Sequence, residues 1–402
     1  MLAATLRTAH DLDLAEECVQ EAYAGALLTW DRDGVPARPG AWLTTVARRK
    51  AVDALRRESR LRPRLPLLVE SALGDDEGSA PEASQDPGAA AVSDDRLRLI
   101  FMCCHPALSD DAQVALTLRL VCGVSAADIA RLLFVSEPTM NARLTRAKKK
   151  ISVARIPVRI PDGADLAPRL RTVLSVIYLL FTVGHTAPSG PSLVRAGVAD
   201  EAVRLSRLAH ERFPAEPETA GLLALCLATD ARRDARVDDS GQAVRLADQD
   251  RANWDRRAIE EARRLVAPTL RDDDAGRYAL QAAIALAHAE APSFEDVDWE
   301  QIVRLYDRLL VAWPSPVVAL NRAVAVAKTR GPAAALAEVE DLERDGRLGA
   351  YHYLPAVKAH LLEQLGRSRE AEIANRRALE LATNDVERAF LAGHATLRSD
   401  DD

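Results

Sequence analysis

The chain has 402 residues, enough for two to four domains, and its residue usage favours an all-helical protein. Aromatic residues make up only 4% of it, Ala, Leu and Arg abound, and strand-like alternation is scarce. No apolar run approaches the roughly 20 residues of a membrane span, and no signal peptide is evident, so we expect a cytoplasmic protein without membrane contact. The five scattered cysteines argue against a disulfide framework.

The net charge of −7 hides a segregation of charge along the chain. Residues 1–155 hold 21 Lys and Arg and 21 Asp and Glu, but eight of these acids lie between Leu65 and Asp95, where no basic residue occurs. The segments on either side of that stretch are therefore basic. Because the basic charge is local, net acidity does not exclude nucleic-acid binding.

The first predicted helix begins near Asp13, in the run DLAEECVQEAYAGALLTW. One stripe of it is apolar and consists of Leu14, Cys18, Ala22, Ala26 and Leu27. The opposite face is acidic and polar, with Asp13, Glu16, Glu17, Gln20 and Glu21. This face is either a solvated surface or a docking surface for a basic partner. The Gly and Pro content of Asp31–Pro39 then predicts a loop.

A second predicted helix has the sequence AWLTTVARRKAVDALRRE. Its apolar side consists of Leu43, Val46, Ala47, Ala51, Ala54 and Leu55. The remaining surface is crowded with Arg48, Arg49, Lys50, Arg56 and Arg57. Trp42 at the start is either a core anchor or a platform on which a nucleobase stacks. The next stretch is acidic and rich in Gly, Ala, Ser and Pro, which predicts a flexible linker.

One or two helices are expected between Asp94 and Leu120, and Asp110, Asp111 and Gln113 fit a helix N-terminus after Ser109. Cys103-Cys104-His105 resembles a metal-binding cluster at first sight. Adjacent cysteines coordinate one ion poorly, however, and no second pair stands at the spacing of a zinc finger. We therefore expect these residues in the core and predict no metal or other cofactor.

The stretch Ser125–Ile151 predicts two helices joined by a tight turn, the second ending in positive charge. Ala127, Ala130, Leu132 and Leu133 form the apolar face of the first helix, and Asp128 lies in its first turn. In the second helix, Ser136 fits the N-cap and Met140, Leu144 and Ala147 recur at helical spacing, so that Thr139, Asn141, Arg143, Arg146 and Lys149 point outward. This is the pattern of a helix-turn-helix, whose second helix enters the major groove. The alternative is an ordinary helical hairpin with a solvated basic end.

The chain is predicted to be helical to its end after residues 156–163, and a degenerate repeat is visible there. Gly197, Ala202, Ser206, Ala209 and Pro214 stand at the same offsets as Gly366, Ala371, Asn375, Ala378 and Thr383, and Ile302, Tyr306, Leu309 and Pro314 repeat the later part. Small residues at such positions predict tetratricopeptide-like helical pairs stacked into a solenoid with a concave groove. The alternative is a plain antiparallel helical domain.

The most polar and aromatic cluster of this part is Asp248–Arg251 with Trp254. We expect it to hold the helices together by charge-assisted hydrogen bonds and buried Asp–Arg pairs. The alternative is a contact surface for the N-terminal domains.

Taken in order, these elements resemble the extracytoplasmic-function sigma factors of bacterial RNA polymerase. Residues 13–20, 34–36, 39–43 and 47–57 are similar to region 2 of that family, and Asp128-Ile129-Ala130, Ser136 and residues 139–147 are similar to region 4. Residues 101–120 and 247–255 resemble the subgroup with a C-terminal tetratricopeptide-like domain. Two departures stand out: Phe134 replaces the usual small residue at the bend, and the chain begins close to Asp13, where the family has a full preceding helix.

The resemblance implies an all-α fold in four parts. These are sigma region 2 over residues 1–62, an acidic flexible linker over 63–92, the helix-turn-helix region 4 over 93–156 and a tetratricopeptide-like helical solenoid over 157–402. The implied partners are the RNA polymerase core, through its beta-prime clamp and beta flap, and promoter DNA. The C-terminal part is expected to regulate the sigma domains, by contacting them or another protein.

The resemblance also assigns roles to residues. Asp13, Glu16, Glu17 and Gln20 match the surface for the polymerase clamp. Trp42, Arg48, Arg49, Arg56 and Arg57 match the part that engages the minus-ten element, and the loop 31–39 matches the part that captures a flipped base. The recognition helix for the minus-thirty-five element is matched by Pro138, Thr139, Asn141, Ala142, Arg143, Arg146 and Lys149, whereas Lys148 and Lys150 with Lys149 favour phosphate contacts.

Two other functions compete with a sigma factor. A helix-turn-helix transcriptional regulator would sense a peptide or protein through the solenoid, but it needs neither the acidic first helix nor the basic second one. An enzyme would need an active site among the scattered His185, His210, His288, His352 and His360. No nucleophile elbow, phosphate-binding loop or metal-ligand pair accompanies them, so no catalytic residue is assigned.

Overall fold

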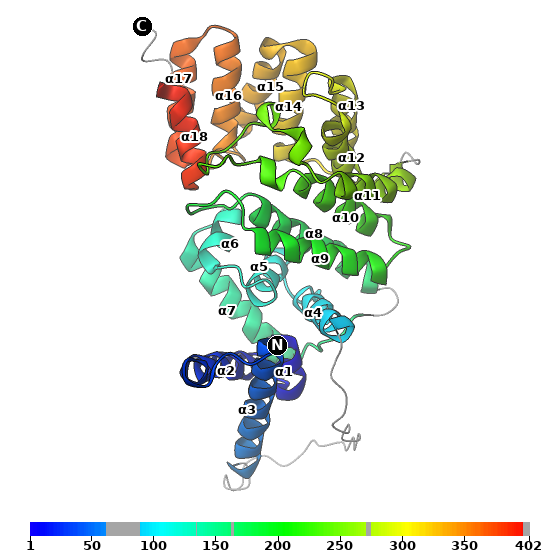
Figure 1. Cartoon of the computed structure of the whole chain (residues 1–402), viewed down its shortest axis with the longest axis vertical. Helices are drawn as coiled ribbons and strands as arrows, with labels where there is room; N and C mark the ends of the chain where they lie inside the picture. Colours follow the sequence, from blue (N-terminus) through cyan, green and yellow to red (C-terminus); the bar gives the residue numbers. More distant parts are fainter. Residues whose placement is uncertain (62–88, 134, 162–164, 271–274, 397–402) are drawn as a thin grey trace. The chain divides into compact units, whose positions relative to one another are not determined.

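The computed structural model describes residues 1–61, 89–133, 135–161, 165–270 and 275–396 (Figure 1). Regular structure in these residues is helical, with two isolated β-bridges, so the prediction of an all-α fold is confirmed. The chain divides into two compact units. The N-terminal unit comprises Met1–Ala126 and Glu137–Val173, and the C-terminal unit comprises Ala127–Ser136 and Leu174–Asp402.

Helices make up most of the described residues. Up to the middle of the chain they are α1 (Leu2–Ala9), α2 (Leu12–Asp33), α3 (Pro39–Leu61), α4 (Ala89–Cys103), α5 (Asp110–Leu120), α6 (Ala126–Leu132), α7 (Glu137–Ala154) and α8 (Leu166–His185). Beyond it they are α9 (Ala196–Arg212), α10 (Pro217–Asp230), α11 (Arg256–Val266), α12 (Arg277–Glu290), α13 (Trp299–Ala312), α14 (Pro316–Arg330), α15 (Pro332–Asp345), α16 (Tyr353–Gln364), α17 (Ser368–Leu381) and α18 (Asp385–Thr396). Between them lie 3-10 turns, η3 (Arg233–Ala235), η4 (Leu246–Asp248), η5 (Arg251–Asn253) and η6 (Ala267–Leu270).

The predicted linker and the predicted bend can be compared with these helices only in part. The linker predicted over residues 63–92 lies mostly outside the described residues, and so does the departure from the family pattern at Phe134. Helix α4 begins at Ala89, so the last residues assigned to the linker are helical instead.

A short helix precedes the first predicted one. The side chains of Ala3, Leu6 and Ala9 in α1 are buried, and α1 packs on α2 and α3. Asp11 then starts α2, because its carboxylate accepts a hydrogen bond from the backbone N–H of Leu14 at 2.9 Å. Eight residues of helix thus stand before Asp13, where the family has a full helix.

Two predictions at the end of α2 are wrong. The helix continues to Asp33, so the loop is shorter than predicted and starts at Gly34, whose positive φ of 81° favours glycine. Leu27, assigned to the buried stripe, is 80% exposed. The stripe follows Ala22 and Ala26, and Leu27 lies about 100° further round the helix than Ala26.

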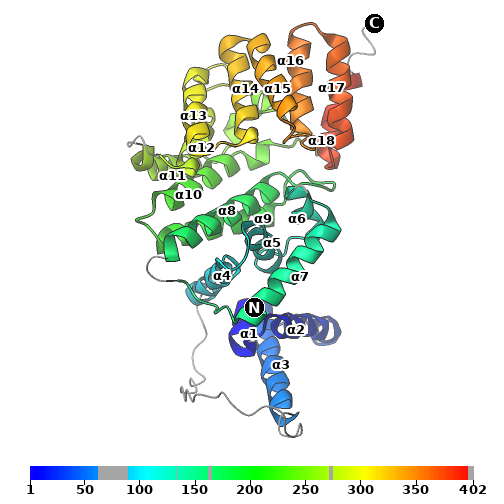
Figure 2. The same ribbon diagram turned by 180° about the vertical axis from the view of Figure 1, so that it is seen from behind.

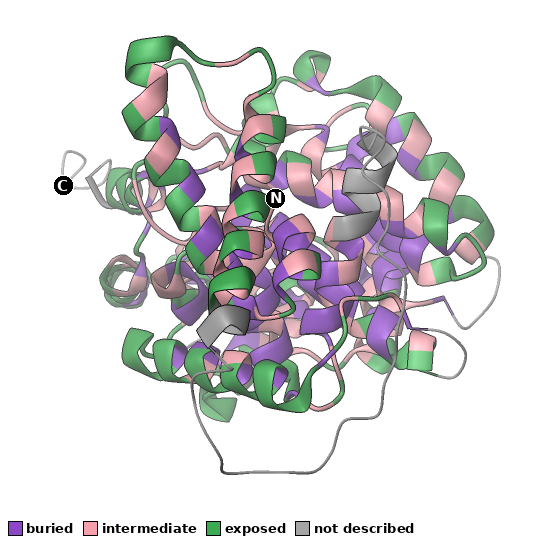
Figure 3. Ribbon diagram, turned by 90° about the horizontal axis from the view of Figure 1, so that it is seen from below, coloured by how far each residue is buried: buried purple, intermediate pink, exposed green. Residues whose placement is uncertain are grey.

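In the C-terminal unit, successive helices pack on one another, and α13 to α17 stand side by side in both views (Figures 1 and 2). In Figure 3 single helices have a buried side and an exposed side. The three predicted repeats fall on α9, α13 and α17. Two sets of equivalent positions are at most 1% exposed, namely Ala202, Ile302 and Ala371, then Ala209, Leu309 and Ala378. The repeat pattern thus marks the buried side of these three helices.

Small residues let the helices of the C-terminal unit approach closely. A Cβ atom added at Gly184 of α8 would lie 2.4 Å from the backbone nitrogen of Ala199 in α9. One added at Gly221 of α10 would lie 2.6 Å from the backbone nitrogen of Ala279 in α12. Only glycine allows these two backbone contacts. They let the helices pack closely although the unit has few aromatic side chains to fill gaps between them.

Helix α8 corrects the expectation that no apolar run approaches the length of a membrane span. It has 20 residues and is apolar enough to cross a membrane by length and composition alone. Half of its most apolar window is buried inside the protein, and the core helix of a soluble protein passes the same test.

The Asp248–Arg251 cluster holds the structure together, but by other bonds than predicted. Asp248 pairs with Arg245 at 2.6 Å, and both side chains are about half exposed. Asp250 accepts a hydrogen bond from the backbone N–H of Ala252 at 2.9 Å, which is a local cap. Arg251 carries the long-range contacts.

The guanidinium of Arg251 donates to the carbonyl oxygens of His288 and Ala291, each at 2.8 Å, at the end of α12. It also lies 4.5 Å from the ring centroid of the buried Trp254. One cation therefore satisfies two carbonyls that the end of a helix leaves without partners.

We expect Arg251→Ala to lower the free energy of unfolding of the C-terminal unit by about 2 kcal/mol, because two hydrogen bonds from a charged donor are lost. Urea unfolding followed by tryptophan fluorescence measures it. Arg257→Ala, at an exposed residue of α11, is the matched control. Equal midpoints for the two variants would show that Arg251 does not hold α12.

Candidate nucleic-acid and protein interface

Helix α7 has the face that the helix-turn-helix pattern predicts. Met140, Leu144 and Ala147 are buried, as expected. Most of the residues assigned to base and phosphate contacts are exposed, namely Pro138, Thr139, Asn141, Ala142, Arg146 and Lys149, whereas Arg143 and Lys148 are not. The helix begins at Glu137, directly after Ser136. An α-helix with outward amide and guanidinium groups can read base edges in the major groove.

Arg143 is held by a neighbouring helix. Its Nη1 lies 3.1 Å from Oδ2 of Asp111, on α5, and its side chain is only 20% exposed. The prediction that Arg143 points freely outward is therefore wrong, because a carboxylate on the neighbouring helix attracts it. In this structure the residue ties α5 to α7.

Helix α3 presents a basic surface. Arg48, Arg49, Arg56 and Arg57 are exposed, as predicted, whereas Lys50 pairs with Glu21 of α2 at 2.7 Å. The rings of Trp42 and Trp30 meet edge to face with centroids 5.5 Å apart. Around them lies a small core of Ala22, Ala26, Leu43 and Ala47. Trp42 is thus a core anchor of α3 that keeps part of its ring exposed.

Helix α2 carries an exposed face that is acidic at one end and apolar at the other. Residues 13, 16, 20, 23 and 27 follow one another at steps of three and four, so they share one side of the helix. Asp13, Glu17 and Gln20 are exposed at the acidic end. At the other end Tyr23 is 52% exposed, and Leu27 and Leu28 are each 80% exposed. Sequence reasoning missed this apolar end because it placed Leu27 in the core.

The ion pair of Glu16 and Lys148 joins α2 to α7 within the N-terminal unit. The hydroxyl of Ser152 lies 3.4 Å from Oδ2 of Asp11 beside it. A residue predicted to bind a protein and a residue predicted to bind phosphate therefore neutralise each other. Sequence spacing could not predict this contact, because 132 residues separate the two side chains.

Helix α6, the first helix of the predicted helix-turn-helix, groups with the C-terminal unit. Asp128 of this helix is only 7% exposed and has partners in that unit. Its Oδ2 lies 2.7 Å from Nη1 of Arg195, and its Oδ1 accepts hydrogen bonds from Ser189 at 3.0 Å and from Arg131 at 3.1 Å. The sequence placed Asp128 in a first helical turn but did not reveal its partners 61 and 67 residues away.

Cys103 and Cys104 lie in the core, as predicted. Burial raises the pKa of the Cys104 thiol to about 12 and that of the Cys103 thiol well above its ordinary value. Cys104 Sγ lies 3.9 Å from the Thr117 hydroxyl. Among the described residues, no group of three or more His, Cys, Asp or Glu side chains is placed to hold a metal ion.

The helical fold and the exposed polar and basic face of α7 are those expected of a DNA-binding transcription protein. Comparison with known families agrees. Residues 2–61 match sigma-70 region 2, residues 98–151 match sigma-70 region 4, and residues 169–270 match a family of unknown function, DUF6596. No solved structure matches the chain.

Two relatives extend this result. An uncharacterized protein of Rhizobium meliloti (strain 1021), R00370, is 47% identical over 390 residues, which cover 97% of this chain and 91% of the relative. The ECF RNA polymerase sigma factor SigJ of Mycobacterium tuberculosis is 33% identical over 204 residues, which cover 45% of this chain and 60% of SigJ. The chain belongs to the extracytoplasmic-function sigma factors, in a group with a helical C-terminal extension.

We expect a single cysteine of the native protein to react quickly with Ellman's reagent. Cys122 is the only one of the five that is partly exposed, and the thiolate that reacts is suppressed in the buried ones. Cys122→Ser should remove the fast phase. Fast modification of Cys103 or Cys104, located by mass spectrometry, would contradict their assignment to the core.

Proposed function

We propose that this sigma factor directs core RNA polymerase to specific promoters through both of its sigma regions. The observation that carries the proposal is the pair of exposed faces in one unit, the recognition face of α7 and the acidic–apolar face of α2. A regulator that only binds duplex DNA needs the first face and has no use for the second.

The DNA contacts are divided between two helices. Thr139, Asn141 and Arg146 of α7 would read the minus-thirty-five element, because an amide pairs with adenine and a guanidinium with guanine in the major groove. Pro138, Ala142 and Lys149 share this exposed surface. Arg48, Arg49, Arg56 and Arg57 of α3 would follow the phosphates of the minus-ten element, while Trp42 offers its exposed part to a base.

The polymerase contact would be made by α2. Asp13, Glu17 and Gln20 give it charge and hydrogen-bonding groups, and Glu16 joins them once its pair with Lys148 opens. Both side chains of that pair are only about a quarter exposed, so opening it requires that a cation of the partner replace Lys148. Tyr23, Leu27 and Leu28 supply an apolar centre, which protein interfaces use for affinity. The beta-prime clamp and the beta flap are the surfaces of the core that we expect to be bound.

We expect the double variant Leu27→Asp and Leu28→Asp to lower promoter-specific transcription by roughly tenfold or more, because two charges enter an apolar contact. The measurement is in vitro transcription with core polymerase and a library of promoter sequences. Val311→Asp, at an 88% exposed residue of α13, is the matched control.

Binding to duplex promoter DNA should stay unchanged in the double variant. If the wild-type chain binds duplex DNA but never initiates transcription with core polymerase, the proposal is wrong. The chain would then act as a helix-turn-helix regulator.

We also propose that the C-terminal unit, built of tetratricopeptide-like helical pairs, regulates the sigma regions through α6. Ile302 and Ala371 stand 69 residues apart, about twice the period of 34 residues of such repeats. Arg195 and Ser189 of this unit bind Asp128, so the position of α6 depends on the extension. Breaking a buried ion pair is costly, because it leaves the other charge without a partner.

We expect Arg195→Gln to lower transcription from promoters that depend on the minus-thirty-five element several-fold, because α6 loses its anchor. Transcription from the same templates by the full chain measures the effect. The control is Arg204→Gln, which breaks a pair with Glu201 at 2.7 Å on the same helix α9. Unchanged transcription in Arg195→Gln would refute regulation by this route, and increased transcription would show that the extension restrains the sigma regions.

A further inference from the structure

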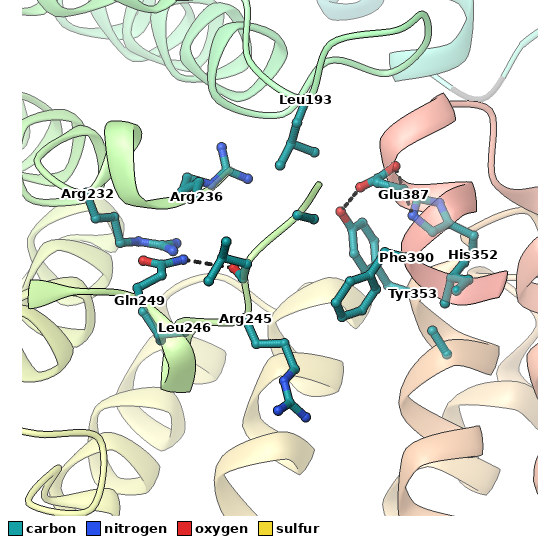
Figure 4. A pocket seen from close by; sticks show the side chains of 14 residues that line it. Leu193, Arg232, Arg236, Arg245, Leu246, Gln249, His352, Tyr353, Glu387 and Phe390 are labelled. Carbon is teal, nitrogen blue, oxygen red and sulfur yellow. Dashed lines mark hydrogen bonds and ion pairs between the residues drawn. The ribbon is translucent and has the colours of Figure 1, made fainter. Parts of the chain in front are cut away.

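A cavity of about 230 Å³ lies inside the C-terminal unit and takes no part in the contacts discussed so far (Figure 4). Four parts of the unit line it. They are the segment after α10 with Arg232 and Arg236, the segment 243–249, the start of α16 and helix α18. Leu193 closes one side.

Most of the charged side chains on this cavity have partners. Arg236 donates to the carbonyl oxygen of His185 and, at 3.1 Å, to the hydroxyl of Thr186. Arg245 pairs with Asp248. Glu387 accepts from the Tyr353 hydroxyl and lies 3.3 Å from Nε2 of His352.

Arg232 differs from them. Within the described part of the chain, its guanidinium has neither a hydrogen-bond acceptor nor an ion-pair partner. Burial, together with the nearby charge of Arg236, lowers its pKa to about 10. An unpaired cation in a largely buried place is unfavourable, and an anion beside it would remove that cost.

The other residues that line the cavity indicate which further groups the ligand carries. Leu193, Leu246, Phe390 and Leu391 form the apolar part of its wall. Gln249 donates to the carbonyl oxygen of Val244 at 3.1 Å, and its Oε1 is buried without a donor. The cavity is smaller than the roughly 300–1,000 Å³ of sites for drug-sized molecules, so it suits a compact ligand.

We propose that the C-terminal unit binds a small organic anion in this cavity, a carboxylate on a compact apolar body. The carboxylate pairs with Arg232, whose planar guanidinium offers two parallel N–H donors. The apolar body lies against Leu246 and Phe390. A free inorganic anion would satisfy the charge but leave this apolar wall uncovered.

The ligand would act on α6 through the segment Thr186–Arg195, a step that rests on the proposed function. Leu193 of this segment touches the cavity, and Arg195 at its end binds Asp128. Asn384, next to α18, donates to the carbonyl oxygens of Ala187 and Ser192 at 3.0 and 2.9 Å. The segment is thus held between the cavity and α6 by bonds at both ends.

The test is isothermal titration calorimetry of the full chain with benzoate, octanoate, benzamide and inorganic phosphate. We expect the two carboxylates to bind at least roughly tenfold more tightly than benzamide or phosphate. Benzamide lacks the negative charge, and phosphate lacks the apolar body. Equal binding of benzoate and benzamide would overturn the assignment to an anion. Phosphate binding as tightly as benzoate would overturn the role of the apolar wall.

The variant Arg232→Gln should weaken benzoate binding by roughly tenfold or more, and Arg376→Gln, on the exposed side of α17, should leave it unchanged. Circular dichroism checks that both variants fold. If Arg232→Gln does not fold, the comparison of benzoate with benzamide on the native chain still decides. Absence of carboxylate binding at millimolar concentrations would refute the proposal.

These titrations contain no polymerase and no DNA, so their result does not depend on sigma activity. If benzoate binds but the chain fails to initiate transcription, the cavity proposal stands and the proposed function fails. If transcription succeeds but no carboxylate binds, the reverse holds.

Discussion

The buried carboxylate of Asp128 is the constraint on which the organisation of this sigma factor depends. A carboxylate that is 7% exposed must be paired, because its desolvation is otherwise too costly. Its partners Arg195 and Ser189 belong to the extension, so one helix of region 4 is held by residues that lie outside region 4 in the sequence. Region 4 and the extension therefore share a structural element, which is the basis of the proposed regulation.

Charge pairing also determines which predicted interface residues are exposed. Glu16 with Lys148 and Arg143 with Asp111 are engaged within the N-terminal unit, whereas Asp13, Glu17, Asn141 and Arg146 remain exposed. Both pairs are partly buried, so only a partner with a better-placed opposite charge can replace them. The interface thus combines residues that are ready for contact with residues that must first exchange an internal partner.

Small residues set the packing of the extension. Close contacts at Gly184 and Gly221 bring backbones together, and alanine fills the equivalent repeat positions Ala202 and Ala371. Helices that pack through small residues leave little room between them. The cavity at Arg232 is an exception to this close packing. That cavity occurs where the regular succession of helices is interrupted by the segment between α10 and α11.

The sequence by itself determined the helical fold and which faces of its helices are buried. Met140, Leu144 and Ala147 follow the helical period, and so does the repeat that places Ala209, Leu309 and Ala378 in the core. Periodicity is a local property, so it is visible in a single sequence. It misplaced Leu27, since one step of about 100° decides between core and surface at the edge of a stripe.

Only the tertiary structure decided which charges meet. Asp128 finds Arg195 across 67 residues, Glu16 finds Lys148 across 132, and Arg232 has no such partner among the described residues. Arg251 likewise binds carbonyls of α12 that no local pattern indicates. The physical reason is that ion pairs depend on distance in space, and helix packing brings together residues whose separation along the chain carries no signal.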